Sequence, residues 1–134
     1  MSRQGQQRPT RQELLRAVCE HVSRTGDATL PWGQVPGLES EFGSPDAVLL
    51  ELHRRWYARF AARLDALLED SPDDLAGAAR DLWEELTAED PARRALLDAY
   101  RDHPALAAAE ERQRRLLWLA TAGDRRRVAV PSRA

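Results

Sequence analysis

The sequence predicts an all-α protein in which about five helices pack on one long central helix, residues 44–69. Two observations carry this prediction. Apolar residues recur at helical spacing in most segments, and a capping residue followed by proline marks several helix starts. In addition, no Asn-Gly or Asp-Gly turn joins two alternating apolar runs, as a β-hairpin would require.

The central helix has the longest unbroken pattern in the chain. Ser44 is a good N-cap, and Pro45 suits the first helical position because its missing N–H would be unpaired there anyway. Apolar residues then share one face: Leu49, Leu52, Trp56, Phe60, Leu64 and Leu67. A stripe of arginines follows another face, at Arg55, Arg59 and Arg63, and we interpret it as a solvated face that can pair with acidic helices.

The first helix is predicted to start at Thr10, which forms a capping box with Glu13, and to end at Gly26. Its apolar face is Leu14, Leu15, Val18, Cys19 and Val22. Residues 27–43 contain prolines and glycines that make any helix there short. The apolar residues of this stretch should fold back onto the core: Trp32, Val35, Leu38 and Phe42.

Three further helix starts follow, at Ser71-Pro72, Asp90-Pro91 and His103-Pro104. The inner face of the last helix is predicted as Leu106, Ala109, Gln113, Leu116, Leu117 and Ala120, with Gly123 as its end. Pairs at i, i+4 spacing should support it on the outside, from Glu110 to Arg114 and from Glu111 to Arg115.

The totals fit one soluble domain. The chain has 134 residues and a net charge of −2, and its 20 basic residues are all arginine. We expect a disordered arm over residues 1–9, a single helical domain over residues 10–123 and a flexible basic tail over residues 124–134. The single Cys19 fits a reducing cytoplasm, and no stretch approaches the roughly 20 apolar residues of a membrane helix.

Two blocks resemble the TetR family of bacterial transcriptional regulators. TRQELLRAVCEHVSRTGDAT, residues 10–29, is similar to the opening helix of that family and to its Gly-x-x-Thr turn. FGSPDAVLLELHRRWYARFAARLDALL, residues 42–68, is similar to the Phe-Gly-Ser-Lys block and to the long helix that connects the DNA-binding and ligand-binding parts. Residues 90–115 resemble the regulatory domain of that family in the general character of their sequence. The likeness implies a TetR-like cytoplasmic regulator with a pocket for a small apolar ligand.

The segment between these two blocks departs from the family pattern. The family places a recognition helix there, whereas LPWGQVPGLESE, residues 30–41, is shorter, is broken by Pro and Gly, and has no Arg or Lys. We therefore interpret it as a degenerate helix-turn-helix with weakened or atypical DNA binding. The residues expected to contact DNA are Arg8, Arg11, Gln34 and Ser40.

The aromatic residues suggest where a ligand would bind. At helical spacing they are most often core residues, but a pocket between helices is a usual ligand site. Its expected lining is Trp56, Phe60, Trp83 and Tyr100, with His53 at the mouth. We expect no catalytic residue, metal site or cofactor, because His, Cys and carboxylates show no catalytic or metal-binding spacing. The chain is thus not expected to be an enzyme.

Besides a small helical enzyme, which would need a buried polar cluster near His53, two functions remain open from the sequence. The first is a TetR-like regulator that senses a ligand and contacts DNA weakly. The second is a helical module that does not bind DNA and binds a small ligand or a protein partner instead. A homodimer is a further expected assembly for either one, and no membrane partner is expected.

Overall fold

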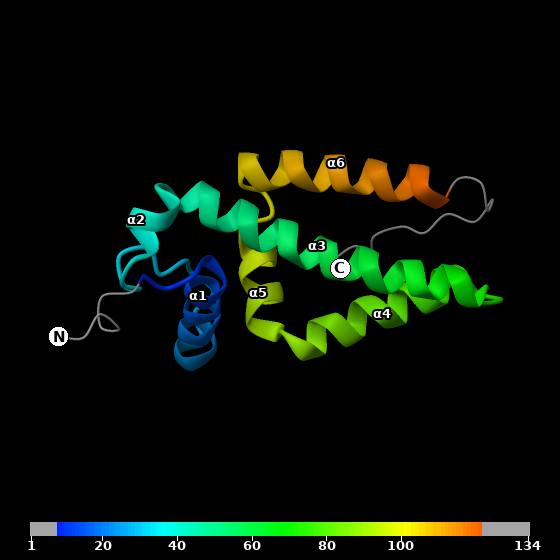
Figure 1. Cartoon of the computed structure of the whole chain (residues 1–134), viewed down its shortest axis with the longest axis horizontal. Coiled ribbons are helices and arrows are strands. Elements are labelled where there is room, and N and C mark those ends of the chain that lie inside the picture. The colour runs from blue at the N-terminus through cyan, green and yellow to red at the C-terminus, as the bar shows by residue number, and fades with distance from the viewer. Residues whose placement is uncertain (1–7, 122–134) are drawn as a thin grey trace.

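A computed structural model describes residues 8–121 of the chain, and it confirms the all-α class (Figure 1). Within this range six helices follow one another, one more than the sequence indicated, because the short α2 lies inside the Pro- and Gly-rich stretch. They are α1 (Arg11–Thr25), α2 (Leu38–Phe42), α3 (Pro45–Asp70), α4 (Leu75–Glu89), α5 (Pro91–Ala99) and α6 (Pro104–Thr121). None of these helices is both long and apolar enough to cross a membrane.

The long helix α3 is the centre of the fold. Ser44 caps it by accepting a hydrogen bond from the Ala47 N–H, and Pro45 occupies its first position, as predicted. Figure 1 shows α4 and α6 along different sides of α3, while α5 crosses it and α1 packs against α5. The buried residues of α3 are Val48, Leu49, Leu52, His53, Trp56, Tyr57, Phe60 and Leu64.

The first helix follows its sequence signals closely. Thr10 and Glu13 form the predicted capping box, and Gly26 ends the helix in the left-handed region at φ 71°. All five predicted core residues of α1 are buried. The loop that follows turns back onto the core, since Val35, Leu38 and Phe42 are buried and Trp32 is partly buried.

The start of α4 corrects one expectation. Ser71 does not cap this helix: it ends α3 instead, in a left-handed conformation at φ 51°. The N-cap is Asp74, whose carboxylate accepts a hydrogen bond from the Gly77 N–H at 3.0 Å. Because the chain must reverse between α3 and α4, the residues at 71–73 are used in the turn rather than in the helix.

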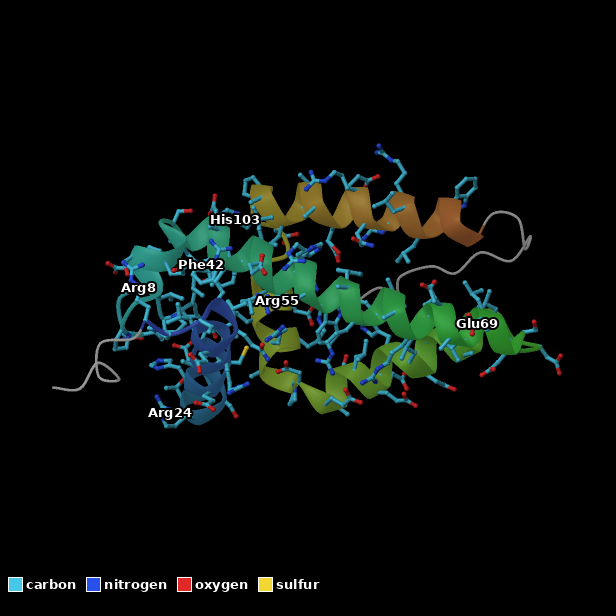
Figure 2. All side chains as sticks on the ribbon, viewed as in Figure 1. Arg8, Arg24, Phe42, Arg55, Glu69 and His103 are labelled. Carbon is cyan, nitrogen blue, oxygen red and sulfur yellow. The ribbon has the colours of Figure 1, made fainter. Side chains whose placement is uncertain are left out.

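The last two helices begin where the sequence predicted. Asp90 caps α5, and the His103 Nδ1 accepts a hydrogen bond from the Ala105 N–H at 3.2 Å. The His103 Nε2 also lies 3.1 Å from Asp46 of α3, so this histidine joins the starts of two helices (Figure 2). One expected inner residue of α6 is wrong: Leu116 is 59% exposed, whereas Leu106, Ala109 and Leu117 are buried.

The arginine stripe of α3 pairs with carboxylates, which agrees with its interpretation as a solvated face that can pair with acidic helices. Arg59 and Arg63 both contact Glu89 at the end of α4, at 2.7 and 3.0 Å, and Arg55 contacts Glu51 at 2.6 Å. The pairs with Glu89 are largely exposed, so each contributes little to stability. Their effect is to fix the last turn of α4 beside α3. The predicted tail over residues 124–134 and most of the predicted arm, together with Gly123, lie outside the described residues.

Trp56 is 1% exposed and is enclosed by core residues, which allows a stability prediction. Replacing it by alanine should lower the free energy of unfolding by about 3–5 kcal/mol, because the change leaves a large cavity in the core. Urea unfolding followed by circular dichroism measures this loss. The control is Leu116→Ala on the exposed side of α6, which should change stability by no more than about 0.5 kcal/mol. A similar loss in both variants would contradict this account of the core.

Candidate functional site

The candidate site is a cavity of about 630 Å³ between α4, α5 and α6, to which α3 contributes His53. Its volume is within the roughly 300–1,000 Å³ usual for small-ligand pockets. Its apolar lining consists of Trp83, Ala88, Pro91, Leu97, Leu106 and Ala107. Charged side chains from all three outer helices and from the turn before α6 also line it, among them Arg94, Asp98 and Glu110.

Arg94 is the most enclosed charged residue of the cavity, with only 8% of its surface exposed. Asp90 and Pro91 start α5, so Arg94 lies in the first turn of that helix, four residues before Asp98. The guanidinium carbon lies 4.8 Å from the centre of the Trp56 ring and 4.9 Å from that of Trp83. Such cation–π contacts, together with a paired carboxylate, allow a charge to be held inside the protein.

The hydrogen bonds of Arg94 are incomplete. Its Nε donates to one oxygen of Asp98 at 3.1 Å, and its Nη2 lies 2.9 Å from the same oxygen as an ion pair. The third nitrogen, Nη1, is buried and has no acceptor anywhere in residues 8–121. A buried donor without a partner costs stability, so this atom is a candidate contact point for a ligand.

A second polar group lies between α3 and α6. The Tyr57 hydroxyl donates to both oxygens of Glu110, at 2.7 and 3.1 Å, and the His53 Nε2 lies 3.8 Å from the nearer carboxylate oxygen. This last distance is too long for a hydrogen bond. The Tyr57 bond attaches α6 to the central helix at the wall of the cavity.

The titration of these groups follows from their surroundings. Burial by itself would raise the pKa of Glu110, but His53, the Tyr57 hydroxyl and Arg94 outweigh it, so this pKa is below its ordinary value. Burial raises the pKa of Tyr57 far above its ordinary value, and the charge of Glu110 raises it further. The pair therefore consists of a carboxylate and a neutral phenol at neutral pH.

The structure brings together only part of the predicted ligand site. His53 and Trp83 line the cavity. Trp56 and Phe60 do not line it: they lie in the core beneath it, against Trp83, with ring centres 5.6 and 5.5 Å from the Trp83 ring. Tyr100 lies elsewhere, because its hydroxyl accepts a hydrogen bond from the Leu30 N–H at 3.0 Å.

Sequence reasoning missed two central residues of the cavity, Arg94 and Glu110. Both belong to charged types that are rarely buried, so the pattern of apolar residues gave no reason to select them. Glu110 was expected to pair with Arg114 on the outside of α6, but its carboxylate faces Tyr57, and Arg114 contacts Glu111 instead at 3.4 Å. A weak signal for Arg94 existed, since it stands three residues before Leu97 on the inner face of α5.

The residues predicted to contact DNA lie apart from this cavity. Arg8, Arg11, Gln34 and Ser40 are all exposed, and Figure 2 shows Arg8 and Phe42 at the α2 end of the molecule. Arg11 is paired with Glu41 at 3.0 Å, and its guanidinium carbon lies 4.7 Å from the centre of the Phe42 ring. The Ser40 hydroxyl donates to the Gly37 carbonyl at 3.2 Å.

The segment that should read DNA is a loop and one short helix packed on the core. Leu38 and Phe42 of the five-residue α2 are buried, and the helix carries Glu39 and Glu41 but no basic residue. Glu41 is occupied by Arg11, and Glu39 is exposed. Exposed carboxylates repel the phosphates of DNA. Without a basic residue, α2 also lacks the charged donors of a recognition helix.

Compared with known proteins, the chain matches no family model, no curated protein and no solved structure. Over residues 8–121 no group of three or more His, Cys, Asp or Glu side chains is placed to hold a metal ion. The cavity and the surface around α2 are therefore the features of this chain that bear on its function.

The hydrogen bond between Tyr57 and Glu110 gives a pH-dependent prediction. Tyr57→Phe should lower the free energy of unfolding at about pH 7 by about 1.5–3 kcal/mol, the usual range for a hydrogen bond to a charged group. The pKa of Glu110 is lower in the folded chain than its ordinary value of 4.5. The ionised carboxylate therefore stabilises the folded chain fully at pH values above 4.5. The effect is lost as the pH falls through the folded pKa, so the loss caused by Tyr57→Phe should shrink in acid.

Urea unfolding measured in steps from about pH 7 to about pH 3.5 checks this prediction. The matched control is Tyr100→Phe, which removes a hydroxyl that accepts a hydrogen bond from a neutral backbone N–H. Its loss should be about 0.5–1.5 kcal/mol and should not change across this range. If the Tyr57→Phe loss is equally constant, Glu110 is not the group that the hydroxyl stabilises.

Proposed function

We propose that the chain is a helical module that binds a small ligand in the cavity between α4, α5 and α6. The observation that carries this proposal is a half-enclosed space of ligand size with apolar lining residues from three helices and an incompletely bonded Arg94 in its wall. The apolar lining residues would hold the body of a ligand. The polar and charged lining residues would set its orientation.

The geometry around α2 favours this module over the TetR-like regulator. The regulator would need a helix that presents donors to DNA bases, whereas residues 30–41 place their apolar side chains in the core. Arg11, a predicted phosphate contact, is engaged by Glu41. The resemblance to TetR regulators is retained as the alternative proposal, in which the same cavity would sense the ligand and exposed arginines such as Arg8 would contact DNA.

A neutral apolar dye tests ligand binding directly. Nile red should bind the purified full chain with a rise and a blue shift of its emission, because the apolar wall excludes water from the dye. In the variant Ala107→Trp an indole would occupy the cavity, since Ala107 lines it on α6. This variant should weaken dye binding by about tenfold or more.

The matched control is Ala108→Trp, the same change at the next residue of α6. Ala108 is exposed and does not belong to the cavity lining, so the variant should bind Nile red like the parent chain. Equal weakening in both variants, or in neither, would mean that the dye binds elsewhere and would contradict the proposed site. Circular dichroism of both variants verifies that the helices are kept.

DNA binding distinguishes the module from the regulator. We expect the full chain to retain no particular fragment of its own genomic DNA at physiological salt, and any retention at low salt should be independent of sequence. Such retention would come from exposed arginines that contact phosphates, and it falls steeply as salt rises. Specific fragments retained at physiological salt would favour the regulator and would overturn our argument from residues 30–41.

A further inference from the structure

Among the buried polar side-chain atoms around the cavity in residues 8–121, several nitrogens have no hydrogen-bond partner, whereas no buried oxygen lacks one. One oxygen of Asp98 accepts a hydrogen bond from Arg94 Nε and lies 2.9 Å from Nη2, and the two oxygens of Glu110 share the hydrogen bond of the Tyr57 hydroxyl. In contrast, three buried nitrogens around the cavity have no hydrogen-bond partner within the described chain. They are Arg94 Nη1, His53 Nε2 and, in the layer beneath, Trp56 Nε1.

From this imbalance we infer that the ligand is a small organic acid with an apolar body, whose carboxylate binds Arg94. This inference rests on the proposed ligand-binding function and names the ligand class for the same cavity. A carboxylate brings only acceptors, and its bond to a guanidinium is charge-assisted. An alcohol would supply a weaker acceptor, and the donors of an amine cannot pair with the buried Arg94 Nη1.

The surroundings of Arg94 explain how it is kept ready for an acid. The rings of Trp56 and Trp83 lie within 5 Å of the guanidinium carbon, and they stabilise its charge without using any of its N–H groups. Asp98 accepts a hydrogen bond from Nε and lies 2.9 Å from Nη2, whereas the buried Nη1 has no partner within the described chain and is the donor left for a ligand.

Binding requires a small movement of Arg94, because Nη1 is covered from solvent in the unliganded chain. Asp98 makes this movement inexpensive. Its side chain is 42% exposed, so water can replace a guanidinium N–H that turns toward the ligand. The carboxylate of the ligand then takes the place of part of the Asp98 contact, while the indole rings continue to stabilise the charge.

The apolar body has a defined place beside this contact. Trp83 lines the cavity and contacts Arg94, and Leu97 and Leu106 line the cavity from α5 and α6. An acid whose carboxylate reaches Arg94 would therefore place its hydrocarbon part against an indole and two leucines. A flat or aromatic body suits the indole best, because aromatic pairs gain from stacked or edge-to-face contact.

Three compounds with the same body test the inference by calorimetry: 4-phenylbutyrate, 4-phenylbutan-1-ol and 4-phenylbutylamine. The butyrate should bind the parent chain at least about tenfold more tightly than either of the others. Equal affinity for butyrate and alcohol, or tightest binding of the amine, would overturn the inference while leaving the proposed cavity in place. If none of the three binds and Nile red does not bind either, the proposed function itself fails.

The variant Arg94→Met assigns the preference to one residue. It keeps an unbranched apolar side chain but removes the guanidinium, so the tenfold preference for butyrate should disappear while the affinity for the alcohol changes by less than about threefold. The matched control is Arg101→Met at the rim of the same cavity, which removes the same charge and should keep the preference. An equal loss in both variants would overturn the assignment to Arg94. If Arg94→Met does not fold, the comparison of the three compounds on the parent chain still decides the ligand class.

Discussion

The fold depends on covering α3 from several sides at once. Its buried side chains are too many for a single neighbouring helix, and they include three large aromatic rings, Trp56, Tyr57 and Phe60. Burial of such rings dominates the favourable energy of a small helical domain. The chain meets this demand by placing α4 and α6 along different sides of α3 and by crossing it with α5 (Figure 1). The cavity is a consequence, because helices arranged in this way do not close the space between the α4–α5 corner and α6.

Arg94 is the clearest case of a charge that this arrangement has to accommodate. A buried cation is costly unless carboxylates and hydrogen bonds compensate for it. Here the compensation comes from Asp98 on the same helix and from the rings of Trp56 and Trp83 on two others. The same two indoles contribute to the core of α3, so the structural core and the wall of the cavity share their residues. A change in either tryptophan should therefore affect stability and the cavity together.

Features of the fold that depend on neighbours in the sequence could be predicted from it, and features that depend on distant contacts could not. The capping box at Thr10, the cap at Ser44 and the start of α5 at Asp90 are set within a few residues, and all three were predicted correctly. The predicted start of α4 was wrong because two residues that can cap a helix, Ser71 and Asp74, lie close together there. Ser71 belongs to the turn that reverses the chain after α3, and Asp74 caps α4.

The cavity shows the same division. Trp83 and His53 were expected beside a ligand because a pocket between helices is a usual ligand site, and both do line the cavity. The role of Glu110 depends on Tyr57, which is 53 residues away along the chain. Nothing near Glu110 in the sequence shows that its carboxylate faces inward. Charge patterning instead favoured an exposed pair with Arg114, which is the more common situation for a glutamate on a helix.

Residues 30–41 pack on the core in a way that leaves few groups for DNA binding. A recognition helix must keep its donors exposed, and its apolar residues must hold it on the domain beneath. In this chain the prolines and glycines limit the helix to the five residues of α2, and anchoring Leu38 and Phe42 in the core uses both of its ends. The remaining positions carry glutamates and Ser40, and the nearest arginine, Arg11, binds Glu41. The contacts that hold this segment in place thus consume the groups that DNA would need, whereas the donors around Arg94 remain unused. This contrast is our reason for placing the function in the cavity.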